Sequence, residues 1–283
     1  MTHQLFLNVK DHSVSKESFD LYHDTALDLV YTHPQPAATD LGRYYESDDY
    51  ISHTDGKRSF FEKMYQAVKN IALKNKVSLI NKLQPAKGTL LDIGAGTGDF
   101  LITAKQSGWQ TLGIEPSEKA KGIAIKKGVD FIENTATIAN HSIDAITMWH
   151  VLEHVPDVEK QIRELKRIIK PTGTIIIAVP NFNSYDAKHY GNFWAAYDVP
   201  RHLWHFSKTA IKTLFEREGL QLQKVLPMPF DAFYVSLLSE KYKSGNMNFV
   251  KAFFVGATSN WKASQTKEYS SHIYVIAAAQ KVI

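Results

Sequence analysis

A glycine-rich turn that follows an apolar stretch is the part of this sequence with the clearest chemistry. Residues 89–93 have the length and composition of a buried strand, and a helical pattern begins at Asp99. Between them stand Gly94, Gly96 and Gly98, spaced two apart. A strand that enters a helix through glycines lets a ligand approach the backbone closely, with the N-terminus of the helix directed at it. The turn therefore predicts a binding site for a small molecule.

Two acidic residues near the turn indicate what kind of ligand it binds. The dinucleotide fingerprint G-x-G-x-x-G would place its third glycine at Asp99, whereas the third glycine here is Gly98. Asp92 precedes the turn, where a carboxylate suits a cationic amine better than a pyrophosphate. Glu115 closes the next predicted strand and is placed to accept both hydroxyls of a ribose, although Glu115-Pro116 is also compatible with a simple helix start. These residues predict an adenosine ligand.

Two further segments complete a recognisable order. Residues 143–149 predict a fourth strand that runs into the sequence Val-Leu-Glu-His-Val at 151–155, and Leu-Lys-Arg-Ile-Ile-Lys-Pro-Thr-Gly at 165–173 leads into a fifth strand at 174–179. The whole series resembles the class I S-adenosylmethionine-dependent methyltransferases of the small-molecule type, over about residues 86–225. The resemblance implies S-adenosylmethionine as cofactor. The cofactor-binding residues that it implies are Asp92, Gly94, Ala95, Gly96, Gly98, Glu115, Pro116, Trp149 and His150.

The same resemblance implies the fold. It is an α/β architecture with a Rossmann-like, doubly wound sheet of seven mostly parallel strands and an antiparallel last strand. We expect residues 1–84 to form an N-terminal arm, lid and long helix, and residues 85–283 the methyltransferase domain. Apolar spacing predicts the long helix at 60–83, and a helical insertion is expected at about 230–262, before the last strand.

The N-terminal arm carries a second resemblance. Residues 19–36 are similar to the zinc-ribbon segment at the N-terminus of some small-molecule methyltransferases, with Asp24 and Leu27 where those relatives have a pair of cysteines. The sequence contains no cysteine, so we expect the segment to pack without zinc, and no metal site is predicted. Farther along the arm, the aromatic residues Tyr44, Tyr45 and Tyr50 are candidates for a lid over the site or, alternatively, for a cluster that holds the arm to the core.

Histidines supply the candidates for catalysis. An oxygen or carbon acceptor must lose a proton, whereas an amine need only be neutral, and the crevice of an open α/β sheet lies beyond the carboxyl ends of its strands. His150 follows the fourth strand and is the expected base, with His202 or His205 in support. His154 and Arg201 are expected to line the acceptor pocket. The alternatives are packing at a helix start for His154 and, for residues 198–206, docking of the helix that begins after Ser207.

Composition limits the partners. The chain has 283 residues and a formal charge of +4, with Lys and Arg dispersed among Asp and Glu, so no nucleic-acid partner is expected. No apolar run is long enough to span a bilayer and no signal peptide is evident, so we expect a cytoplasmic protein without a membrane partner. The predicted function is methyl transfer to a small-molecule acceptor, with oxygen or carbon favoured over nitrogen. The alternatives are a catalytically silent protein that binds S-adenosylmethionine or S-adenosylhomocysteine and, less favoured, a nicotinamide-dependent oxidoreductase.

Overall fold

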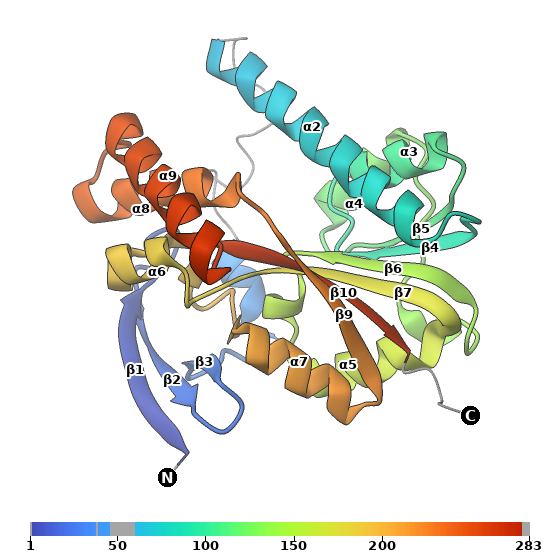
Figure 1. Ribbon diagram of the computed structural model, residues 1–283, viewed down its shortest axis with the longest axis horizontal. Coiled ribbons are helices and arrows are strands. Elements are labelled where there is room, and N and C mark those ends of the chain that lie inside the picture. Colours follow the sequence, from blue (N-terminus) through green and yellow to red (C-terminus); the bar gives the residue numbers. More distant parts are fainter. Residues whose placement is uncertain (1, 38, 46–59, 279–283) are drawn as a thin grey trace.

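A large twisted sheet forms the centre of the molecule (Figure 1). The computed structural model describes residues 2–37, 39–45 and 60–278, and for residues 60–67 only the course of the helix. Within these residues the sheet has six strands. Their order is β5 (Gln110–Ile114), β4 (Thr89–Ile93), β6 (Ile143–Trp149), β7 (Ile169–Pro180), β10 (Ser271–Ala278) and β9 (Leu220–Pro227).

The strand directions match the expected doubly wound fold. The pairs β4–β5, β4–β6 and β6–β7 are parallel, and β10 runs antiparallel between β7 and β9. The expected seventh strand, beside β5, is reduced in the described part of the chain to a single bridge between Gly113 and Phe131. The segment around Phe131 is short, because it lies between a turn at Gly128 and a 3₁₀ turn at Thr135–Thr137.

Helices cover both faces of this sheet (Figure 1). On one side lie α2 (Phe60–Leu83), α3 (Asp99–Gln106) and α4 (Glu118–Lys126); on the other lie α5 (Val158–Ile168) and α7 (Lys208–Arg217). Helix α5 shows why: its apolar residues Val158, Ile162, Leu165 and Ile168 recur at helical spacing and are all buried. Helix α7 begins after Ser207, as expected, and Ser207 is its N-cap, since the Ser207 hydroxyl accepts a hydrogen bond from the Ala210 amide at 2.9 Å.

The N-terminal segment forms a second, antiparallel sheet. Its strands are β1 (His3–Lys10), β2 (Ser18–Asp24), β3 (Leu29–His33) and β8 (Trp204–Phe206), in that order. Because β8 comes from the chain after β7, the first 33 residues share a sheet with the methyltransferase-like part. Where the resemblance places cysteines, the Asp24 carboxylate accepts hydrogen bonds from the amides of Ala26 and Leu27 and closes the turn between β2 and β3.

The helical insertion is confirmed, as α8 (Asp231–Ser244) and α9 (Phe249–Thr266). It is held to the loop after β7, where α6 (Tyr185–Tyr190) begins. There the buried Asp186 carboxylate accepts hydrogen bonds from Trp194, Ser259 and Ser270, each at 2.7 Å. These bonds fasten α9 to the loop after β7, and Asp231 at the start of α8 reaches His150 at the end of β6.

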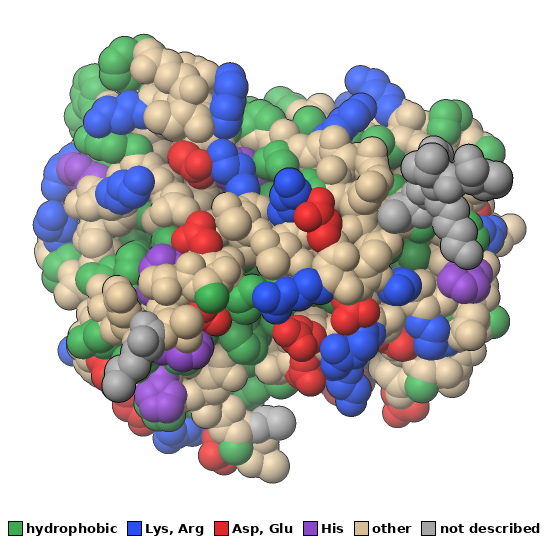
Figure 2. Space-filling model, turned by 60° about the horizontal axis from the view of Figure 1, so that its bottom comes forward, with side chains coloured by type: hydrophobic (Ala, Val, Ile, Leu, Met, Phe, Trp, Pro, Cys, Tyr) green, Lys and Arg blue, Asp and Glu red, His purple; other side chains and the backbone are tan. Residues whose placement is uncertain are grey.

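The surface mixes charges of both signs. On the face shown in Figure 2, Lys and Arg side chains are interspersed with Asp and Glu side chains, as the sequence predicts. None of the helices that the structure describes is both long and apolar enough to cross a membrane.

Candidate cofactor and acceptor site

The glycine turn follows β4 directly, and all three of its glycines have left-handed backbone angles. The φ angles are 74° at Gly94, 54° at Gly96 and 77° at Gly98. A Cβ atom at Gly94 would lie 2.4 Å from Val151, and one at Gly98 would lie 2.6 Å from Val129. At Gly96 a Cβ atom would meet no described atom within 4 Å, so this part of the turn is open. Two glycines therefore serve packing, while the third leaves room for a ligand against the backbone.

Glu115, at the end of β5, is fixed at the open part of the turn. Its carboxylate accepts hydrogen bonds from the backbone amides of Gly96, at 2.7 Å, and Ser117, at 2.8 Å. The side chain is half-buried, and each carboxylate oxygen has lone pairs to spare. The predicted ribose acid therefore lies against the predicted glycine turn, with the exposed Pro116 next to it.

Asp92 belongs to β4, two residues before Gly94. It is buried and accepts a hydrogen bond of 2.6 Å from Thr147 on the neighbouring β6. Burial raises the pKa of Asp92 above the usual range for a carboxyl group. Lys76 of α2 is close enough to counteract part of this shift, and burial lowers the pKa of Lys76 in turn. Lys76 was not predicted, because nothing in the sequence distinguishes it from the other lysines of α2.

Trp149 closes β6 beside the same turn. Its indole packs edge-on against Phe100 of α3, with ring centroids 5.5 Å apart, and the Lys76 ammonium lies 4.2 Å from its ring centroid. Among the described residues the buried Trp149 Nε1 has no hydrogen-bond partner. An indole donor without a partner beside an open glycine backbone fits a site for a flat, polar group such as a purine.

His150 follows Trp149 and is held between two carboxylates. Its Nε2 lies 3.2 Å from Asp231 Oδ2 at the start of α8, and its Nδ1 lies 3.5 Å from Glu153 Oε1. Burial alone would lower the pKa of His150, but these two carboxylates outweigh it and raise the pKa to about 9. The predicted base is therefore protonated at neutral pH in this arrangement. Asp231 was missed because it belongs to the insertion.

The other three histidines predicted for the site, His154, His202 and His205, lie in two different places. His202 and His154 are in contact, with ring centroids 4.6 Å apart, and both lie next to Glu153. Burial, together with His202, lowers the pKa of His154 to about 4, so its imidazole is neutral. The prediction for His205 was wrong: it is buried in β8 with its Nε2 3.2 Å from the Thr32 hydroxyl of β3, and it joins two strands instead of facing the site.

Of the other residues predicted for the acceptor side, some hold the fold together and one reaches the site. Arg201 is buried in ion pairs with Asp11, at 3.0 Å, and Asp198, at 2.6 Å, so it fastens the N-terminal sheet and does not line a pocket. Tyr44 is buried too, and its hydroxyl donates to Glu17 at 2.7 Å, which excludes it from a lid in this arrangement.

Tyr45 does reach the site, because its hydroxyl lies 3.1 Å from His154 Nδ1. Tyr50 lies outside the described residues.

Comparisons with known proteins identify the family of this chain. A family model described as a methyltransferase domain matches residues 62–225. The ubiquinone biosynthesis O-methyltransferase of Saccharophagus degradans is 30% identical over 166 residues, which are 53% of this chain and 70% of that protein. The protein of the same name from Nitrosospira multiformis is 26% identical over 183 residues, covering 58% and 74%.

A solved structure shares the fold. It is the magnesium protoporphyrin IX methyltransferase from Synechocystis with bound S-adenosylhomocysteine, with a TM-score of 0.56 and 15% identity, covering 85% of this chain and 100% of that one.

Proposed function

This chain belongs to the methyltransferase-domain family, as a class I S-adenosylmethionine-dependent enzyme, and we propose that it methylates an oxygen of a small-molecule acceptor. The observation that carries the cofactor assignment is the Glu115 carboxylate held against the open glycine turn. Support for oxygen as the acceptor atom comes from the two relatives named above, which are O-methyltransferases. A nicotinamide cofactor is disfavoured, because the third glycine stands at Gly98 and not at position 99.

We assign the cofactor-binding roles from the contacts of the turn. Glu115 accepts the two ribose hydroxyls, and the backbone of Gly94–Gly98 lies along the ligand. Trp149 borders the purine with its indole ring. Lys76 is available for the carboxylate of the methionine end, since α2 brings its ammonium to the ring of Trp149. When bound, S-adenosylmethionine supplies a methyl group already activated on a sulfonium, so the protein mainly has to align the acceptor and exclude water.

The acceptor side contains the groups that could take a proton from a hydroxyl. The imidazole of His150, where β6 ends, lies between two carboxylates. Its Nε2 is 3.2 Å from Asp231, and its Nδ1 is 3.5 Å from Glu153. We propose that the acceptor hydroxyl takes the place of Asp231 at His150 Nε2, while Glu153 keeps the ring oriented from Nδ1. Loss of the Asp231 ion pair lowers the pKa of His150, so its Nε2 proton leaves to solvent, and the neutral imidazole then accepts the proton of the acceptor hydroxyl at Nε2. His154 and Tyr45 border the acceptor.

The experiment is methyl transfer from methyl-labelled S-adenosylmethionine to a panel of catechols and other phenols. We expect label in at least one product as an O-methyl ether, and less label with the Glu115→Gln variant at concentrations of S-adenosylmethionine that do not saturate it. Tight binding of S-adenosylmethionine without transfer to any phenol, amine or carbon acceptor would contradict the proposal and favour a catalytically silent binding protein.

A further inference from the structure

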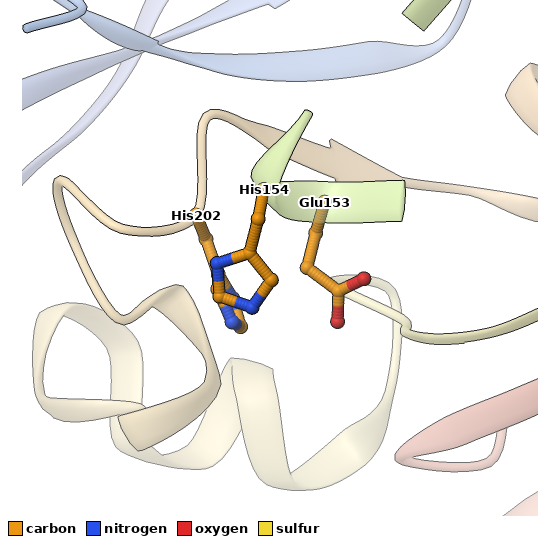
Figure 3. Close-up of side chains that lie close together, drawn as sticks. All are labelled: Glu153, His154 and His202. Atoms are coloured by element: carbon orange, nitrogen blue, oxygen red, sulfur yellow. The ribbon is translucent and has the colours of Figure 1, made fainter. Parts of the chain in front are cut away.

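Glu153, His154 and His202 form a compact cluster beside the acceptor side of the site (Figure 3). Glu153 and His154 belong to the 3₁₀ turn Leu152–His154 that follows β6, and His202 belongs to the loop that precedes β8. One side-chain ligand atom from each of the three residues lies within 4.8 Å of the other two. Figure 3 shows the three side chains extending in the same direction from their backbone segments, with the His154 ring in front of His202 and beside Glu153.

Glu153 gives the first indication that this cluster binds something. Its side chain is inaccessible to solvent, and neither carboxylate oxygen accepts a hydrogen bond from any residue that the structure describes. Glu153 Oε1 forms an ion pair with His150 Nδ1, but the 3.5 Å between these atoms is too long for a good hydrogen bond. A buried carboxylate without hydrogen bonds is unfavourable even beside one imidazolium, so a cation in the cluster would give the Glu153 oxygens the direct partner that the described residues do not supply.

The two histidines are oriented in the way that metal-binding histidines usually are. His202 Nδ1 lies 2.8 Å from the carbonyl oxygen of Ala196, and His154 Nδ1 lies 3.0 Å from that of Arg201. A carbonyl oxygen can only accept, so Nδ1 of each ring is a donor, and Nε2 is the atom that remains to bind a metal ion. The Tyr45 hydroxyl, 3.1 Å from His154 Nδ1, then accepts from the same N–H group. Backbone carbonyls that fix the tautomer in this manner are typical partners of histidine ligands.

We propose that Glu153, His154 and His202 bind a divalent transition-metal ion, for which Zn²⁺ is the best fit. Two imidazoles and one carboxylate suit Zn²⁺, whereas Mg²⁺ and Ca²⁺ prefer oxygen ligands alone. Three protein ligands leave one position of a tetrahedral ion for water or an acceptor oxygen. This site is separate from the turn at Asp24 and Leu27, and its existence does not depend on the proposed methyl transfer.

The cluster was not evident from the sequence because its third member is distant. His150 and His154 are four residues apart and suggest a pair, but His150 is turned to Asp231, and the partner of His154 is His202, 48 positions later. The competing arrangement is a cluster without a metal ion, in which His202 Nε2 interacts only with Glu153 and with Asp198, whose Oδ2 lies 4.0 Å from it.

Calorimetric titration of Zn²⁺ into the metal-free protein, produced without a histidine tag, distinguishes the two. We expect one Zn²⁺ per chain, with Mg²⁺ giving no comparable binding. Glu153→Gln and His202→Asn should each weaken Zn²⁺ binding by more than about 100-fold, which is the upper end of the effect of losing an outer partner. His189→Asn, which changes an exposed histidine of α6, is the matched control and should bind Zn²⁺ as the wild type does.

The result that would overturn the site is a wild-type protein that binds no stoichiometric Zn²⁺, or variants with Zn²⁺ affinity equal to that of the wild type. Circular dichroism and S-adenosylhomocysteine binding check that each variant is folded. A second measurement needs no variant: Co²⁺ added to the wild type should give the visible absorption of a four-coordinate ion, and the spectrum of hydrated, six-coordinate Co²⁺ would overturn the proposal equally.

Discussion

At the scale of single residues, cofactor recognition depends most on Glu115, whose carboxylate is fixed by two backbone amides. Replacing it with alanine removes the charged acceptor for the ribose hydroxyls. We expect Glu115→Ala to weaken S-adenosylmethionine binding by about 1.5–3 kcal/mol, or roughly 10- to 150-fold. Titration calorimetry measures this, with Glu118→Ala as control, since Glu118 is three residues on and exposed. Equal affinity of Glu115→Ala and the wild type would show that the ribose lies elsewhere.

His150 is the residue that we expect to matter for transfer and not for cofactor affinity. If it takes the proton of the acceptor, His150→Gln should lower the single-turnover rate by about 100- to 10,000-fold, because glutamine cannot titrate. S-adenosylmethionine affinity should stay within a few-fold of the wild type. His141→Gln, at an exposed histidine, is the control. A rate close to that of the wild type would mean that His150 only holds Asp231 and Glu153 in place.

The residues that could be predicted are those whose role follows from neighbours in the sequence. The glycine turn and Glu115 are of this kind, because a strand, its turn and the end of the next strand form one local motif. The roles of Arg201 and His205 could not be predicted, because they depend on partners that are distant in the sequence. Their partners, Asp11 and Thr32, are 190 and 173 positions away, and no spacing rule connects them.

At the scale of the element, the turn between β4 and α3 tolerates no side chain at Gly98. Alanine there would keep a φ of 77° and place its Cβ 2.6 Å from Val129 and 2.8 Å from Ala124. We expect Gly98→Ala to lower the free energy of unfolding by roughly 2–5 kcal/mol, from backbone strain and overpacking together. Urea unfolding measures the change.

The matched control is Gly122→Ala in α4, where a Cβ atom meets no described atom within 4 Å. This substitution should raise stability by about 0.5–1 kcal/mol, because alanine loses less conformational entropy in a helix. Unfolding of Gly98→Ala at the same urea concentration as the wild type would contradict the packing of the turn.

Elements with a local signal were predicted well, and those formed by long-range pairing were not. Helix α2 and the capped start of α7 follow from apolar spacing and a serine N-cap. The N-terminal sheet was expected to be an arm, because β1 is mostly exposed and shows no clear apolar alternation. Its order depends on β3 pairing with β8, about 170 residues later in the chain, which no local pattern announces.

At the scale of the whole molecule, Arg201 joins the N-terminal sheet to the domain through Asp11 and Asp198. Removing the charge leaves two acidic groups without their partner, so Arg201→Gln should cost about 3–5 kcal/mol of stability. The exposed Arg163→Gln should cost less than about 1 kcal/mol. Urea unfolding of both variants at pH 7 checks this, and equal midpoints would contradict the role of Arg201.

The ion pair between Asp11 and Arg201 also predicts how the stability of the fold depends on pH. Burial would raise the pKa of Asp11, but Arg201 and the amides of Ser15 and Val14 hold it well below the usual range. A depressed carboxyl pKa stabilises the fold above the unfolded value, about 3.9, and this contribution is lost as the pH falls below it. The stability difference between wild type and Arg201→Gln should therefore be largest near neutral pH and narrow below about pH 4.

The central claim is that the open glycine turn binds S-adenosylmethionine and not a nicotinamide. Calorimetric titration of the wild-type chain with S-adenosylhomocysteine and, separately, with NAD tests it without knowledge of the acceptor. We expect one molecule of S-adenosylhomocysteine per chain and no binding of NAD at the same concentrations. Binding of NAD without binding of S-adenosylhomocysteine would contradict the assignment of the turn, of Glu115 and of the chemistry that follows from them.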